Sequence, residues 1–201
     1  MQKILSFNTI FLGVNVILQD GNKILVSKTF ESKKQSEILV SSLEQILSYN
    51  KLIYNDVDIF STIVGPGNFT GIKTSLAVLK ALQIAIHKKI ITTNVFEIIS
   101  HNKKDYQTII LDMGTVKYYI KNKNGEYYTI YKKEIEEFLN NNKDVKILTN
   151  DYNLNGDNIQ HSAYTNEKWA ELVAFKAENN IFTDEIKPLY IEEATITKRK
   201  N

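Results

Sequence analysis

The stretch Ser61–Lys80, STIVGPGNFTGIKTSLAVLK, decides how this chain folds, because a glycine-rich turn joins an apolar run to a helix-like sequence. The run Val57–Val64 predicts a buried strand. Thr70–His87 predicts a helix, with the Thr70 hydroxyl as the N-cap that accepts from amides of the first turn. A turn of this kind either binds an anion at the helix N-terminus or only reverses the chain. The spacing of its residues distinguishes these two roles.

The turn itself favours a structural or partner-docking role over a phosphate loop. Gly65 and Gly67 give backbone freedom, and Pro66 fixes φ at the first corner of a tight turn. The run Gly71–Thr74 resembles the end of a P-loop, but the glycine required five residues earlier falls at Pro66. The spacing therefore rules out a Walker-type site.

The composition bounds the class of protein. The 201 residues are 43% hydrophobic, which is enough for a sizeable core, and 25 basic against 23 acidic residues give a formal charge of +2. A near-neutral chain lacks the overall charge expected of a nucleic-acid-binding domain. The absence of cysteine excludes disulfides and cysteine–zinc sites and is compatible with a reducing cytoplasm. No segment reaches ~18 uninterrupted apolar residues, so we expect no membrane span.

Periodicity predicts two related α/β lobes, an N-terminal lobe over residues 1–100 and a C-terminal lobe over 101–201. The first lobe begins with a hairpin at Asp20-Gly21, and the second has a hairpin at Asn124-Gly125. The other elements expected in the first half are strands Lys3–Thr9, Phe11–Leu18, Lys23–Phe30 and Lys89–Thr93 and helix Ser36–Tyr49. Those expected in the second half are strands Thr108–Asp112, Val116–Lys121, Glu126–Tyr131 and Val145–Thr149, helices Lys132–Asn141 and Trp169–Glu178, and an extended Pro188–Glu192.

Candidate catalytic groups are sparse. His87, His101 and His161 are far apart in sequence and form no HExxH motif, so we interpret them as surface residues and predict no metal site. No serine lies in a Gly-x-Ser-x-Gly elbow. Asp112–Thr115 joins two strands as a phosphate-binding hairpin would. A match of four residues is too short to indicate a phosphate site, so we interpret the stretch as an ordinary β-turn.

Two helices carry more apolar residues than one face requires. Thr70–His87 is apolar nearly all round, and Ser36–Tyr49 has a strong apolar stripe. Such helices are either buried within one domain or present a second face to another chain. The sequence leaves both interpretations open.

At the glycine turn the chain resembles the TsaB (YeaZ-type) family of glycoprotease-like proteins. That family has a Gly-Pro-Gly-Ser-Phe-Thr-Gly turn followed by a helix with a basic residue two positions on. Asn68 replaces the serine and Lys73 stands for the usual arginine. Leu76, Ala77 and Lys80 also follow the helix pattern. The turn residues that match are Gly65, Pro66, Gly67, Phe69, Thr70 and Gly71.

The chain also departs from this pattern. Asn8 stands where relatives usually have Asp, and Gln35 where they often have His. The central Asp-Ala-Arg appears as Asp112-Met113-Gly114, without the arginine. Weaker similarity extends over most of the chain, including the ending Pro188–Ile191.

The resemblance implies an actin-like ATPase (ribonuclease H-like) fold and a cytoplasmic, non-catalytic accessory subunit without a cofactor. Such subunits bind a TsaD-like catalytic subunit, which a TsaE-like ATPase joins, and the complex forms threonylcarbamoyl on adenosine 37 of tRNA. The tRNA would be reached only through the complex, and the same helices would allow a homodimer. We expect the interface at Ile38, Leu39, Ile72, Lys73, Leu76, Leu79, Lys80 and Gln83. The alternative is an active nucleotide-dependent phosphotransferase or a glycoprotease-like metallopeptidase.

Overall fold

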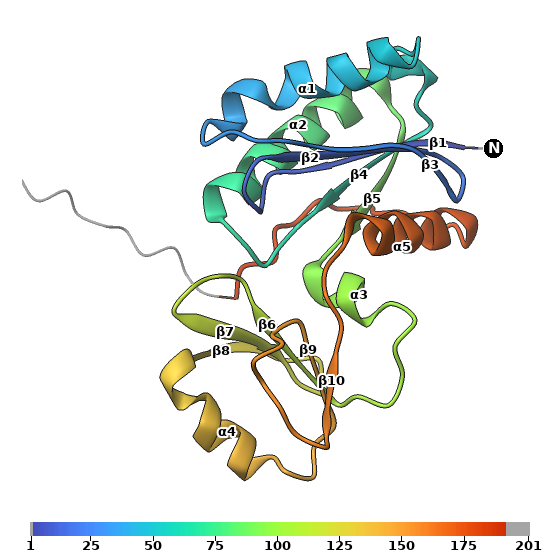
Figure 1. The fold of residues 1–201 in the computed structure, drawn as a ribbon. Coiled ribbons are helices and arrows are strands. Elements are labelled where there is room, and N and C mark those ends of the chain that lie inside the picture. Colours follow the sequence, from blue (N-terminus) through green and yellow to red (C-terminus); the bar gives the residue numbers. More distant parts are fainter. Residues whose placement is uncertain (1, 192–201) are drawn as a thin grey trace, which may run out of the picture.

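A computed structural model describes residues 2–191, which form two stacked α/β lobes (Figure 1). Each lobe is built on a mixed five-stranded sheet, in the orders β3-β2-β1-β4-β5 and β10-β9-β6-β7-β8. The first sheet contains β1 (Lys3–Asn8), β2 (Val14–Asp20), β3 (Lys23–Phe30), β4 (Ile59–Ile63) and β5 (Lys89–Thr93). The second contains β6 (Thr108–Asp112), β7 (Lys117–Lys121), β8 (Tyr127–Tyr131), β9 (Ile147–Thr149) and β10 (Ile159–His161).

The two sheets have the same plan. In each, three strands form an antiparallel meander, and parallel strands continue the sheet from the first strand of that meander. The two-residue connection Gly21-Asn22 closes the β2–β3 hairpin, and Gly21 there has φ +56°. This left-handed conformation is one that glycine adopts without a steric cost.

Helices cover both faces of the first sheet (Figure 1). Helices α1 (Gln35–Tyr49) and α2 (Phe69–Ile86) pack against one another and against the same face, over β2 and β4. Helix α5 (Asn166–Glu178) packs against β2, β3 and β5 and against the short α3 (Val95–Ser100). In the second lobe, α4 (Ile135–Asn141) follows a 3₁₀ turn at Lys132–Glu134. Another 3₁₀ turn lies at Tyr54–Asp56.

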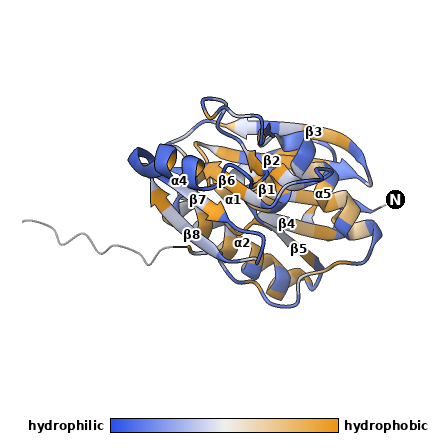
Figure 2. Ribbon diagram, turned by 90° about the horizontal axis from the view of Figure 1, so that it is seen from below, coloured by the Kyte–Doolittle hydropathy of each residue, from blue (hydrophilic) through white to orange (hydrophobic). Residues whose placement is uncertain are grey.

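The hydrophobic core is continuous between the lobes. The larger cluster joins the first sheet and its helices to Ile109, Leu111 and Leu148 of the second sheet, with Trp169 fully buried. A smaller cluster around Ile110, Ile120 and Ile135 packs beneath α4. Figure 2 shows the hydrophobic residues gathered along central strands such as β1 and β2, with hydrophilic residues on connecting loops.

Two short elements were not predicted from the sequence, and one helix packs on the first sheet although it follows the second in the chain. Residues 95–100 form α3. The sequence pattern of these six mostly apolar residues does not distinguish a helix from a strand. The polar stretch 151–163 contains β10, which pairs with β9. Helix α5 and the backbone at Thr183 and Leu189 pack on the first sheet, although residues 101–201 were assigned to the second lobe. The predicted end at Glu192 lies outside the described residues.

Candidate functional site

The glycine turn starts α2 with an asparagine cap. Asn68 is the N-cap, and its side-chain oxygen accepts a hydrogen bond from the Gly71 amide at 3.1 Å. The prediction of Thr70 as the cap is therefore wrong, because the helix begins at Phe69 and Thr70 lies within its first turn. Asparagine caps helices at least as well as threonine. A capping side chain was therefore correctly predicted at this turn, but at Thr70, two residues after the actual N-cap.

The first turn of α2 lies directly against the end of β1. A Cβ added at Gly71 would lie 1.9 Å from the Thr9 carbonyl oxygen, so only glycine fits. The Thr9 hydroxyl donates to the Gly71 carbonyl at 2.6 Å and lies 2.8 Å from the Ser75 hydroxyl. Because the single Thr9 hydroxyl proton is used, Ser75 donates to Thr9. These contacts fix the angle at which α2 leaves the sheet.

Backbone from near the end of the chain holds the other side of the turn. The Leu189 amide donates to the Val64 carbonyl at 2.8 Å, and a Cβ at Gly65 would lie 2.6 Å from the Leu189 carbonyl oxygen. Gly65 has φ +129° and precedes Pro66 through a cis peptide bond. The Tyr190 ring lies 4.9 Å from that of Phe69. The turn is thus packed between β1 and this segment.

Helix α2 is far more apolar than its burial requires. By length and composition it is the one helix within residues 2–191 that could cross a membrane, with mean hydropathy 1.3, yet only 28% of its residues are buried. Its buried side faces β4, as expected of a helix packed on a sheet. Val78, Leu82 and Ile86 are partly buried against the same core, and the outermost side of the helix is exposed.

The expected interface residues divide between the two sides. Lys73 and Lys80 are exposed, and Ile38 and Gln83 are partly buried. Leu39, Ile72, Leu76 and Leu79 are at most 6% exposed and belong to the core, so the expectation that these four face outward is wrong. A helix apolar on every side gives no sequence signal for which side meets the sheet.

The outer surface of the helix pair consists of other residues, which we call the α1–α2 face. It combines small and branched apolar side chains with lysines at its edge. Ile84 is 73% exposed and Val40 47% exposed. The exposed members on α2 are Lys73, Ala77, Lys80, Ala81, Ile84 and Ala85, and those on α1 include Val40, Ser41, Glu44 and Tyr49.

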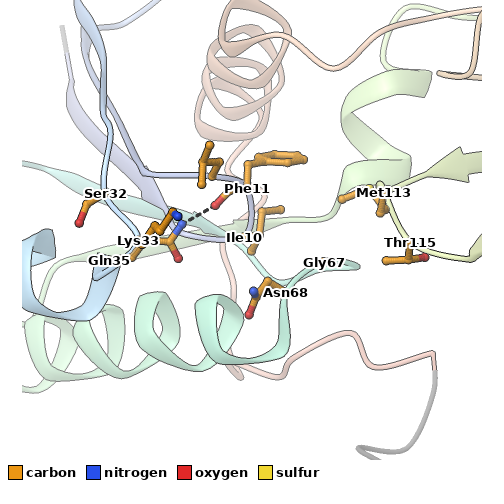
Figure 3. Close-up of a pocket in the computed structure, with 10 residues that line it drawn as sticks. Ile10, Phe11, Ser32, Lys33, Gln35, Gly67, Asn68, Met113 and Thr115 are labelled. Carbon is orange, nitrogen blue, oxygen red and sulfur yellow. Dashed lines mark hydrogen bonds between the residues drawn. The ribbon is translucent and has the colours of Figure 1, made fainter.

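A hollow of about 510 Å³ lies beside the glycine turn (Figure 3). Gly67 and Asn68 line it from the turn, and Met113 and Thr115 line it from the β6–β7 turn of the second sheet. The remaining lining residues are Ile10, Phe11, Leu12, Ser32, Lys33 and Gln35. The hollow is open and weakly charged, since Lys33 is its one ionisable lining residue.

Titratable groups elsewhere form local structural pairs. The Tyr118 hydroxyl donates to Asp151 at 2.5 Å, and Lys132 pairs with Asp112 at 2.5 Å. Burial and the Asp151 carboxylate raise the pKa of Tyr118 well above its usual value. Among residues 2–191 no three His, Asp or Glu side chains gather as metal ligands would.

The comparisons with known proteins identify the family. The family model for tRNA N6-adenosine threonylcarbamoyltransferase (TsaD) matches residues 26–176. The chain belongs to this family. A search among curated proteins gives no significant match.

Two solved structures from Pseudomonas aeruginosa have the same fold. One, an uncharacterized protein with similarity to peptidase YeaZ, has a TM-score of 0.68 at 14% identity, over 96% of this chain and all of that chain. The other, YeaZ itself, has a TM-score of 0.64 at 13% identity, over 94% of this chain and all of that chain. The predicted actin-like, two-lobed α/β fold is confirmed.

Gln35 and Asn8, which depart from the YeaZ-type pattern, make side-chain hydrogen bonds. Gln35 donates to the carbonyls of Phe11 and Gly13 at 2.5 and 3.0 Å and ties α1 to the β1–β2 turn. Asn8 is fully buried and reaches the Tyr164 hydroxyl at 3.5 Å, while its side-chain oxygen has no partner. Met113 lines the hollow. Sequence reasoning missed the positioning pair Thr9 and Ser75, because single hydroxyl residues far apart in sequence carry no motif.

Proposed function

We propose that this chain is a non-catalytic accessory subunit that binds and activates a TsaD-like catalytic subunit in forming threonylcarbamoyl on adenosine 37 of tRNA. A TsaE-like ATPase would join the pair, and the complex would act in the cytoplasm. The observation that carries the proposal is α2, an apolar helix with only 28% of its residues buried. An apolar surface of this kind, rimmed by polar residues, marks a protein–protein interface.

The α1–α2 face has the shape of a helix-packing surface. Ala77, Ala81 and Ala85 recur every four residues along one side of α2, so they form a shallow ridge. Ile84 and Val40 supply larger apolar side chains that lose water on contact. Small residues allow close approach of a partner helix, and the exposed Lys73 and Lys80 suit an acidic rim on that partner.

The test is co-purification of a tagged TsaD-like subunit with Ile84→Asp. Burying a carboxylate at the centre of the interface costs binding free energy, so we expect loss of the complex. Ile181→Asp is the matched control, since Ile181 is also exposed, at 48%, and follows α5 on the opposite face of the sheet. An unchanged complex from a folded Ile84→Asp chain would overturn the proposed interface.

The alternative partner for the α1–α2 face is a second copy of this chain, and gel filtration of the isolated chain tests for it. If wild type is a dimer that Ile84→Asp splits while the TsaD-like subunit never binds, the α1–α2 face serves self-association only. Dimerisation together with competitive binding of the catalytic subunit supports the proposal.

The hollow beside the glycine turn favours a second candidate, an active nucleotide-dependent phosphotransferase. Its volume is within the usual range for small-molecule sites, and both lobes contribute lining residues. Calorimetry with ATP and a divalent metal tests this candidate. Micromolar binding by the isolated chain would favour the enzyme, and its absence the accessory subunit.

A further inference from the structure

Strands β7 and β8 place tyrosines and lysines together on one side of the second sheet. In the register, Lys117 lies opposite Tyr131, Tyr119 opposite Thr129 and Lys121 opposite Tyr127. Because alternate residues of a strand share a face, these six residues lie on the same side. We call this set the lysine–tyrosine face: Lys117, Tyr119, Lys121, Tyr127, Thr129 and Tyr131.

The other side of the same strands has a different role. Tyr118 is 4% exposed and Ile120 is fully buried, and both belong to the core cluster beneath α4. On the lysine–tyrosine face Tyr131 is 47% exposed, while Tyr127 packs one end against Phe96 with the ring centroids 5.3 Å apart. Tyr119 also packs against the larger core cluster, so the face is anchored at Tyr119 and Tyr127 and is most open to solvent at Tyr131.

Lysine ammonium groups lie directly over these rings. The Lys117 ammonium is 4.9 Å from the centre of the Tyr131 ring, and that of Lys133 is 5.5 Å from the same centre. The Lys121 ammonium is 5.6 Å from the centre of the Tyr127 ring. Three ammonium groups therefore lie close to the faces of the Tyr127 and Tyr131 rings.

The local charge differs from that of the whole chain. Residues 117–134 contain five lysines (117, 121, 123, 132 and 133) and two acids, Glu126 and Glu134, a local charge of +3 against +2 for the chain. Glu126 accepts a hydrogen bond from the Asn122 side chain, and Glu134 accepts one from the Tyr131 amide at 3.0 Å. Lys132 is paired with Asp112. Net charge, which indicated no direct contact with nucleic acid, therefore hides this surface.

We propose that the lysine–tyrosine face binds single-stranded nucleic acid, with an unpaired base stacked on Tyr131 and phosphates paired with Lys121 and Lys133. Aromatic rings on a sheet stack unpaired bases, and adjacent cations neutralise the backbone. A duplex keeps its bases stacked inside and offers no ring to Tyr131. This inference goes beyond the proposed accessory role and does not depend on it.

Fluorescence anisotropy of the full chain with labelled oligonucleotides of about 12 residues tests the proposal. We expect oligouridine and oligothymidine to bind at low salt and a duplex of equal length to bind at least tenfold more weakly. The RNA and DNA arms show whether the 2′-hydroxyl matters. Equal binding of duplex and single strand, or no binding at all, overturns the proposal.

Matched variants locate the site. Lys121→Gln/Lys133→Gln should lower the slope of log affinity against log salt by about 1.4, since each lost phosphate contact lowers it by about 0.7. Lys28→Gln/Lys89→Gln is the control, because those exposed lysines also lie over rings, of Phe30 and Phe182. If both double variants change the salt slope equally, the binding is a nonspecific electrostatic attraction and the proposal fails.

A further pair isolates stacking from charge. Tyr131→Leu keeps an apolar side chain but removes the ring, and we expect about a tenfold loss of single-strand affinity. Tyr152→Leu, at a 63% exposed tyrosine outside both proposed surfaces, should leave the single-strand affinity unchanged. The Tyr131→Leu and lysine variants should still co-purify with the TsaD-like subunit. That readout separates failure of this proposal from failure of the proposed function.

Discussion

The hydroxyl of Ser75 on α2 lies 2.8 Å from the hydroxyl of Thr9 at the end of β1, and both side chains are fully buried. Ser75 also accepts a hydrogen bond from the Thr9 amide at 3.0 Å. The pair joins residues 66 apart in sequence and holds the first turn of α2 on the sheet.

Ser75→Ala should therefore destabilise the fold by about 1–3 kcal/mol, because the buried Thr9 amide loses its acceptor. Urea unfolding followed by circular dichroism measures this change. Ser41→Ala is the control, since the exposed Ser41 hydroxyl only bonds back to the Ile38 carbonyl within α1. Equal stability of the two variants would show that the Thr9–Ser75 pair does not support the helix.

Gly71→Ala should cost at least about 3 kcal/mol, the upper end of overpacking penalties, because its methyl group would meet the Thr9 backbone. Gly114→Ala is a useful comparison. Gly114 has φ +72° but nothing within 4 Å of an added Cβ, so only left-handed strain of about 1–2 kcal/mol is expected. A Gly71→Ala chain as stable as wild type in urea would mean that β1 and α2 can separate without cost.

The sequence predicted the strands and helices that have a clear period or a glycine turn. Asn124-Gly125 and the run Val57–Val64 are examples, because hairpin chemistry and buried strands depend on neighbouring residues. It missed α3, since Val95–Ser100 is too short to show a helical period. Strand β10 was missed because its pairing with β9 is set by tertiary contacts.

The candidate site was predictable only in part. The apolar excess of α2 was visible in the sequence, but the side that meets the sheet depends on packing at Gly71 and Ser75. Leu76 and Leu79 were therefore expected outside, whereas Ala77 and Ile84 are the exposed residues. The lysine–tyrosine face was hidden in the same way, since only the β7–β8 register brings Lys117 beside Tyr131.

The position of the helix cap can be tested directly. Asn68→Ala should cost about 1 kcal/mol, because the Gly71 amide loses its acceptor. Asn68→Ser, which restores the serine of the YeaZ-type pattern, should be close to wild type. Thr70→Ala should also be nearly neutral, since the exposed Thr70 does not cap the helix. Thermal unfolding ranks the three variants, and a larger loss for Thr70→Ala than for Asn68→Ala would contradict the assignment.

The Tyr118–Asp151 pair predicts how stability depends on pH. Burial by itself would raise the pKa of Asp151. The hydrogen bonds from Tyr118 and Asn153 outweigh that effect and, with the Lys132 charge, hold the pKa below its usual value. A carboxyl with a lowered folded-state pKa stabilises the fold above its unfolded pKa of about 4 and loses that contribution as pH falls through the folded value.

Tyr118→Phe removes a donor to the carboxylate, so it should move the acid-unfolding midpoint to higher pH. At neutral pH it should also cost about 1–3 kcal/mol, since Asp151 is 8% exposed and loses a charged hydrogen bond. Tyr128→Phe in the neighbouring strand is the control, because burial and then the Glu126 charge, with no Asp151 contact, raise its pKa. Acid titrations of the two variants followed by tryptophan fluorescence measure the difference. Coincident midpoints would mean that Tyr118 does not set the pKa of Asp151.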